Sequence, residues 1–174
     1  MAETLLNLIR LGIGHQSCAL KHMVDWETME ILAEKQGLLA IVVDGIERLP
    51  KEYRPPQQIL LKWIGIVLQN YEQRYSAYEH AIDTLATFYN YHGLKMMVLK
   101  GYACSLNWPK PEHRPCGDID IWLYGQQKVA DKVLSQERDI KIDTSEHHHT
   151  VFYWRGFSVE NKIGFVSPER RYEL

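Results

Sequence analysis

Two aspartates, Asp118 and Asp120, stand two positions apart in the run RPCGDIDIWLYG, residues 114–125. Ile119 and Ile121 alternate with them, which is the period-2 pattern of a half-buried strand. On such a strand both carboxylates point to one face, roughly 6.5 to 7 Å apart. Like charges this close repel and are poorly solvated near a core, so the pair needs either open water or a cation. Two carboxylates in this arrangement can reach one divalent cation, or two cations a few ångströms apart, as phosphoryl-transfer chemistry requires.

Groups that suit phosphate binding lie upstream of the aspartates. The apolar run KMMVL predicts a buried strand, which leads directly into Lys100, Gly101 and a short helix. A lysine, a glycine that permits close approach and free backbone N–H groups at a helix start together form a phosphate cradle. Arg114, in the loop before the aspartates, is placed to bind another phosphate oxygen. The competing interpretation is structural: a solvated strand edge with Arg114 as an ion-pair partner.

The elements that must position these groups are helical in the first half of the chain. The segments ETLLNLIRLG, DWETMEILAEKQG and LLAIVVDGIERL carry apolar residues at helical spacing, with Asp25 as a predicted N-cap. Two prolines suit the first turn of a long helix over about 56–92, whose aromatic stripe we assign to core packing rather than to base stacking. After Gly93 the pattern becomes strand, helix, strand, helix, and then two strands around a hairpin turn at Arg155–Gly156.

This order of elements predicts an α+β fold, with a helical N-terminal half packed on a small sheet. We expect a helical region over 1–92 and a sheet region over 93–174, which together form one compact unit.

Composition narrows the class of protein. The chain has 174 residues and a formal net charge of −2, which argues against a broad nucleic-acid-binding surface. Its three cysteines fit no zinc or redox spacing and are expected to be reduced thiols. No apolar run is long enough to cross a bilayer, and the N-terminus lacks the features of a signal peptide. We therefore expect a soluble, cytoplasmic protein without membrane contact.

Two further groups of residues leave alternatives open. The run His147–His149 favours a loop or strand-edge role over metal binding, because neighbouring side chains on an extended chain alternate faces. His147 and His149 could still share the carboxylate face and touch a triphosphate. Lys110, His113 and Arg114 form either a solvated loop or a small phosphate-attracting patch.

The stretch VLKGYACSLNWPKPEHRPCGDIDIWL resembles the signature of the uncharacterised nucleotidyltransferase family, within the DNA polymerase beta-type superfamily. The resemblance covers roughly residues 20 to 165, including the helix pair around DWETMEILAEKQGLLAIVVDGIERL. It implies that the sheet is small, mixed and of nucleotidyltransferase type. It also implies that Asp118 and Asp120 bind metal, and that Lys100 and Gly101 stand where the superfamily has its phosphate turn.

The superfamily uses a third carboxylate on a later strand, for which the best match is Glu160 in GFSVENK. Three positions depart from the family pattern. A glutamate replaces the usual aspartate, Lys162 stands where a histidine is common, and Tyr102 stands where many members have Ser or Gly.

The resemblance implies an enzyme that moves a nucleoside monophosphate from a nucleoside triphosphate to an acceptor hydroxyl. Mg²⁺ or Mn²⁺, held by Asp118, Asp120 and Glu160, would bridge the triphosphate, and Lys100 and Arg114 would add positive charge. The acceptor is a small molecule, an RNA or a protein. Two alternatives stay open: an inactive interaction module that keeps the fold, and a toxin-type enzyme that acts on tRNA or protein.

Members of the resembled family usually continue further beyond the third carboxylate, so the resemblance implies a C-terminal truncation. We expect residues 160–174 either to pack across the sheet as an irregular tail or to leave a face that a second copy covers, which would make a homo-oligomer.

Overall fold

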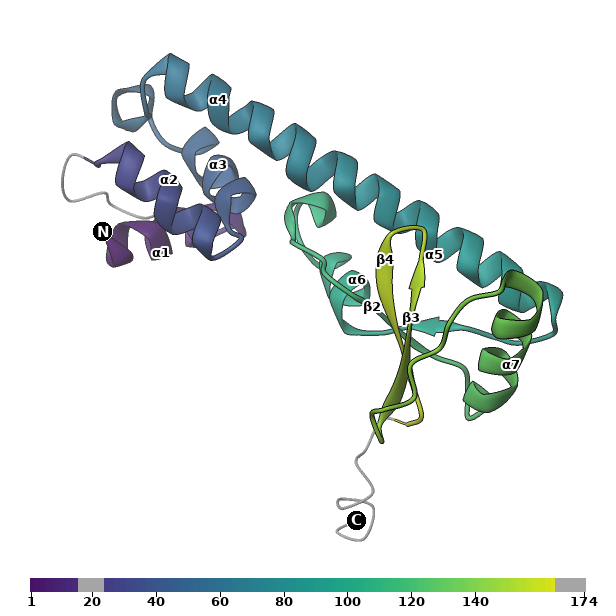
Figure 1. Cartoon of the computed structure of the whole chain (residues 1–174). Helices are drawn as coiled ribbons and strands as arrows, with labels where there is room; N and C mark the ends of the chain where they lie inside the picture. Colours follow the sequence, from purple (N-terminus) through teal and green to yellow (C-terminus); the bar gives the residue numbers. More distant parts are fainter. Residues whose placement is uncertain (16–23, 165–174) are drawn as a thin grey trace, which may run out of the picture. The chain divides into compact units, whose positions relative to one another are not determined.

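The computed structural model describes residues 1–15 and 24–164 (Figure 1). It divides into two compact units, and each is treated separately. The helical unit comprises Met1–Ser76 and Ser105–Pro115, and the sheet unit comprises Ala77–Cys104 and Cys116–Leu174. Cys18 and the tail 165–174, on which two expectations depend, lie outside the described residues.

The helical unit is built mainly from short helices, whose bounds are α1 (Ala2–Gly12), α2 (Trp26–Lys35), α3 (Leu39–Glu47), the 3₁₀ turn η1 (Lys51–Tyr53), α4 (Gln57–Val67), the π-helical turn η2 (Leu68–Glu72) and the 3₁₀ turn η3 (Pro111–His113). The predicted N-cap is confirmed, since the Asp25 side chain accepts a hydrogen bond from the Thr28 backbone N–H at 3.2 Å. Helix α3 is buried over nearly all its length and forms the centre of this unit's core.

The long predicted helix is present as α4, η2 and α5 (Gln73–Tyr91), which follow one another without a break. Its aromatic stripe is core, as predicted, because Trp63, Tyr75, Tyr78 and Tyr89 are all buried. The boundary between the two units falls inside α5, after Ser76.

Helices α1 and α3 pack so closely that glycines are needed at their contact. A Cβ added to Gly45 would collide with the carbonyl oxygen of Leu8, and one added to Gly12 would collide with that of Ile41. Backbone atoms cannot yield as a flexible side chain can, so these positions tolerate no side chain without a shift of the helices.

We therefore expect Gly45→Ala to lower the free energy of unfolding by about 1–3 kcal/mol, the usual cost of overpacking. Gly65→Ala is the matched control, since Gly65 is an exposed position of helix α4 with no atom near an added Cβ. There the gain in helix propensity should stabilise by about 0.5–1 kcal/mol. Urea unfolding of both variants checks this, and equal effects of the same sign would contradict the packing argument.

The sheet unit holds the remainder of α5 together with β1 (Met97–Val98), α6 (Lys100–Ser105), β2 (Ile119–Trp122), α7 (Gln127–Arg138), β3 (His149–Trp154) and β4 (Phe157–Lys162). The strands lie in the order β1-β2-β4-β3, and β2 pairs with β4 in parallel while the other two pairings are antiparallel. The predicted α+β class and the small mixed sheet are thus confirmed (Figure 1).

Strands β3 and β4 form the predicted hairpin. Arg155 and Gly156 have φ angles of +48° and +86°, the left-handed conformations that a tight two-residue turn requires. This short turn fixes the register of the pair, in which Val151 lies opposite Glu160.

One face of the sheet is packed and the other carries polar groups. Apolar side chains from α5, α7 and strands β2, β3 and β4 form one buried cluster, which includes Leu85, Leu134, Ile121, Phe152 and Val159. Because successive strand residues alternate faces, the residues between the buried ones on β2 and β4 emerge on the opposite face. That face carries the carboxylates described next.

Candidate metal centre on the sheet

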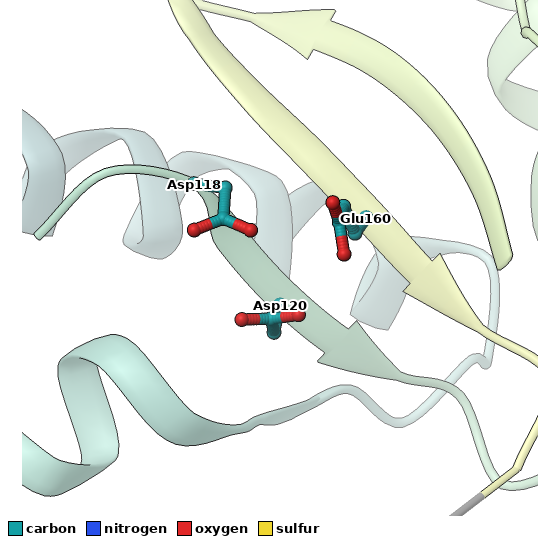
Figure 2. A group of neighbouring side chains, drawn as sticks. All are labelled: Asp118, Asp120 and Glu160. Carbon is teal, nitrogen blue, oxygen red and sulfur yellow. The ribbon is translucent and has the colours of Figure 1, made fainter.

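Asp120 lies on strand β2 and Asp118 directly precedes it, and both follow the predicted alternation. Ile119 and Ile121 are fully buried in the core, so Asp118 and Asp120 project from the other face (Figure 2). The Tyr78 hydroxyl on α5 donates a hydrogen bond to the Asp118 carbonyl oxygen at 2.6 Å, which fixes the start of the strand. Asp118 is half-buried, whereas Asp120 is only 2% exposed.

Glu160 joins them because β4 runs parallel to β2 and next to it. The register places Asp120 directly opposite Glu160, and both side chains project from the same face. Each of the three acids offers an oxygen, and these oxygens lie within 4.8 Å of one another. Figure 2 shows the three carboxylates gathered along the neighbouring strands. The three acids that the sequence indicated as metal ligands therefore lie together in one cluster.

Lys100 reaches the cluster from the start of α6, shortly after β1. The Leu99 backbone N–H donates to the Asp120 carbonyl oxygen at 2.8 Å, which ties the residue before Lys100 to the strand. The Lys100 ammonium lies 2.8 Å from Asp120 Oδ1, although its side chain is 61% exposed. Its φ of +23° is an unusual backbone conformation for a lysine, and such conformations concentrate at functional sites.

Lys162, a departure from the family pattern, is the second cation of the cluster. Its ammonium lies 3.0 Å from Asp120 Oδ1 and also contacts Glu160 Oε2. The chain itself therefore supplies positive charge beside the paired aspartates, from the ammonium groups of Lys100 and Lys162. Sequence reasoning missed this contact, although strand alternation from Glu160 could have placed Lys162 on the same face.

The two ammonium groups set the charge state of Asp120. Burial raises the pKa of this carboxyl, but Lys100 and Lys162 lower it by more, so the pKa lies below its ordinary value. Both ammonium groups lie within ion-pair distance of Asp120 Oδ1, at 2.8 and 3.0 Å, so they stabilise the ionised carboxylate. Burial also lowers the pKa of Lys162, and its carboxylate partners raise it above its ordinary value. Asp120 and Lys162 are therefore both charged at neutral pH.

The other predicted phosphate-binding residues are placed differently. Gly101 lies in the first turn of α6, where an added Cβ would meet only the Tyr78 hydroxyl and the Asp118 carbonyl at ordinary contact distances of 3.6 and 3.7 Å. Arg114 belongs to the helical unit, where its guanidinium lies 5.9 Å from the centre of the Trp108 ring. Arg114 is therefore not part of the carboxylate cluster within the sheet unit.

Of the histidine run, only His149 approaches the carboxylates. It lies on β3 with Nε2 3.8 Å from Glu160 Oε1, whereas His147 and His148 are exposed in the preceding bend. Tyr102 turns toward α5, and its hydroxyl donates to Glu79 Oε1 at 3.0 Å.

The loop cations Lys110 and His113 are paired within the helical unit. The Lys110 ammonium lies 2.6 Å from Asp44, and the two ring nitrogens of His113 lie 2.7 Å from Asp44 and 3.2 Å from Glu72. Burial lowers the pKa of His113, but the two carboxylates raise it by more, so the net pKa is above 6.5. Burial likewise raises the pKa of Asp44, and His113 and Lys110 bring it below 3.8. These contacts tie η3 to α3 and η2.

This buried pair predicts a pH-dependent stability. The contribution of His113 is fully present below its unfolded pKa of about 6.5 and is lost as the pH rises through the higher folded value. The contribution of Asp44 is present above its unfolded pKa of about 3.9 and is lost as the pH falls through the lower folded value. Asp44→Asn should therefore cost about 2 kcal/mol of unfolding free energy near pH 5.5, and clearly less near pH 9. Urea titrations at both pH values measure the difference. Glu52→Gln, exposed in η1, should show no such dependence, and an equal loss in Asp44→Asn at both pH values would contradict the pairing.

Across residues 1–15 and 24–164, no helix combines the length and apolar character that a membrane span requires.

Comparison with known proteins gives one match. No curated protein and no solved structure was found to match the chain. A family sequence model, that of an uncharacterised nucleotidyltransferase, matches residues 22–174, which is most of the chain and includes all three carboxylates. The chain belongs to this uncharacterised nucleotidyltransferase family.

Proposed function

We propose that this chain transfers a nucleoside monophosphate from a nucleoside triphosphate to an acceptor hydroxyl, with Asp118, Asp120 and Glu160 holding Mg²⁺ or Mn²⁺. The observation that carries the proposal is the convergence of these three carboxylates on one sheet face, with oxygens within 4.8 Å of one another. Family membership supports the class of reaction.

The residues present suit a divalent cation. Hard cations such as Mg²⁺ prefer carboxylate oxygens, and the cluster offers three acids from two adjacent strands. The low pKa of Asp120 keeps this carboxylate ionised at neutral pH, so no proton has to leave before a cation binds. When bound, the metal would supply positive charge to the phosphate oxygens and to the attacking oxygen.

In the reaction, the acceptor oxygen forms a bond to the α-phosphorus, the bond from that phosphorus to the bridging oxygen breaks, and pyrophosphate leaves. A carboxylate of the cluster accepts the acceptor's proton. Lys100 supplies fixed positive charge to the phosphates, with Gly101 beside it. Lys100 is suited to this role because its side chain is largely exposed and can turn from Asp120 to a phosphate.

The acceptor is a small molecule, an RNA or a protein, and we expect the protein to work in the cytoplasm with reduced thiols. Cys104 is a free thiol. We also propose that a second copy of the chain can bind to form a homo-oligomer.

A second candidate function is an inactive module that keeps the fold for interaction with another protein. The observation that favours it is the pair of ammonium groups already placed on Asp120, which compete with a metal for the same oxygen.

The test is a screen of all four ribonucleoside triphosphates, labelled on the α-phosphate, with Mg²⁺ or Mn²⁺ and a cell extract fractionated into small molecules, RNA and protein. We expect label to appear in one acceptor fraction, with release of unlabelled pyrophosphate, and to disappear when the metal is chelated. A parallel screen with nucleotides labelled on the γ-phosphate would identify a kinase if that label were transferred instead. No transfer from any nucleotide would favour the inactive module.

A further inference from the structure

Lys162 occupies a more confined position than Lys100. It lies on β4 opposite Trp122 of β2 on one side and His149 of β3 on the other. Its side chain is 16% exposed, against 61% for Lys100. Lys100 can leave the cluster for solvent at little cost, whereas the Lys162 ammonium, lying among strand residues, can move only to a new partner close by.

The Lys162 ammonium contacts the same oxygens that a cation would use. It lies 3.0 Å from Asp120 Oδ1 and contacts Glu160 Oε2, so it bridges two strands through two of the three acids. With Lys100, two positive charges face three negative ones, and the cluster keeps a net charge of about −1. A divalent cation on these oxygens would meet an ammonium within a few ångströms, a strong repulsion in a partly buried site.

We propose that Lys162 is the resident counter-cation of the carboxylate cluster, which the divalent metal displaces and which the triphosphate then engages, so that metal and nucleotide bind cooperatively. This inference rests on the proposed function. The triphosphate brings several negative charges with the metal and so provides the new partner that the displaced ammonium needs. Metal alone offers no such partner, and its binding leaves the confined ammonium without a counter-charge.

The test measures Mn²⁺ binding from the electron paramagnetic resonance signal of the free ion, with and without a non-hydrolysable nucleoside triphosphate, after correction for the Mn²⁺ that the nucleotide binds in the absence of protein. For the wild-type chain we expect weak binding of Mn²⁺ alone, and binding at least about tenfold tighter with the nucleotide, since about 1.4 kcal/mol of coupling is tenfold. Lys162→Met should bind Mn²⁺ alone about tenfold more tightly than the wild type, with the coupling to nucleotide reduced.

Two further variants make the result specific. Lys162→Arg keeps the positive charge and should keep weak binding of Mn²⁺ alone. Lys132→Met removes an exposed lysine of α7 and should leave both affinities unchanged. If Lys162→Met fails to fold, Lys162→Gln, which also removes the charge, takes its place with the same expected result.

The outcomes separate the two proposals. Mn²⁺ that binds the wild type equally well with and without nucleotide would overturn the counter-cation role but leave the metal site intact. The same holds if Lys162→Met binds Mn²⁺ no more tightly than the wild type. If the wild type binds no Mn²⁺ under either condition, the metal site of the proposed function fails, and the counter-cation role fails with it.

Discussion

Asp118→Asn should lower nucleotidyl transfer by about a hundredfold or more while leaving the protein folded. The amide keeps the shape of the side chain but removes the negative charge that a metal needs, and removal of one group that stabilises transition-state charge usually costs this much. Asp118 is half-buried, and no described ion pair depends on its carboxylate. The free energy of unfolding should therefore change by less than about 0.5 kcal/mol.

The measurement is the rate of label transfer at saturating nucleotide, with urea unfolding of the same preparation. Asp83→Asn is the matched control, because Asp83 is an exposed acid on α5 of the same unit. It should keep full activity. If Asp118→Asn retains more than a tenth of the wild-type rate, Asp118 has no direct role in the reaction.

The second large effect is expected on stability. In the sheet unit, the carboxylate of Asp131 on α7 accepts hydrogen bonds from the two strands of the hairpin. The donors are Asn161 of β4 at 2.9 Å and Thr150 of β3 at 2.9 Å. Gln127, also on α7, donates a third hydrogen bond at 3.0 Å. These donor residues are all buried, with Asn161 fully so. Burial raises the pKa of Asp131, and the hydrogen bonds from Asn161 and Thr150 only partly offset it. The carboxyl group thus joins a helix to two strands.

Asp131→Ala should lower the free energy of unfolding by about 3 kcal/mol, because it leaves buried donors of three residues without their acceptor, at about 1–3 kcal/mol for each lost partner before relaxation. Asn161 lies between Glu160 and Lys162 in the sequence, so loosening β4 should also weaken metal binding. Asp83→Ala, at an exposed position of α5, should change stability by less than about 0.5 kcal/mol. Thermal and urea unfolding compare the two variants, and a loss below about 1 kcal/mol for Asp131→Ala would show that the donors find water instead.

The sequence was sufficient wherever a local pattern determines the outcome. Alternation around Ile119 and Ile121 placed Asp118 and Asp120 on one face, and the same rule applied to Val159 placed Glu160. The Asp25 cap and the Arg155–Gly156 turn were likewise predicted, since each depends on residues a few positions apart.

Contacts between segments that are distant in the sequence could not be predicted from such local patterns. Lys162 meets Asp120 only because β4 lies beside β2 in parallel, a pairing that no pattern within either strand specifies. For the same reason the like-charge repulsion expected of the aspartates is offset by two lysines from different parts of the chain. The links from Asp131 to Asn161 and from His113 to Asp44 also join residues far apart in sequence.

The most direct test of the central claim is the position of the metal itself. A crystal of the protein grown with Mn²⁺ and a non-hydrolysable nucleoside triphosphate would reveal the ion by its anomalous scattering. We predict an Mn²⁺ peak at about 2.1 Å from oxygens of Asp118 and Asp120, with Glu160 at the same centre and the triphosphate bound to the ion. A structure in which nucleotide and Mn²⁺ bind elsewhere, while Lys100 and Lys162 still lie on Asp120, would contradict the assignment of this cluster as the metal site.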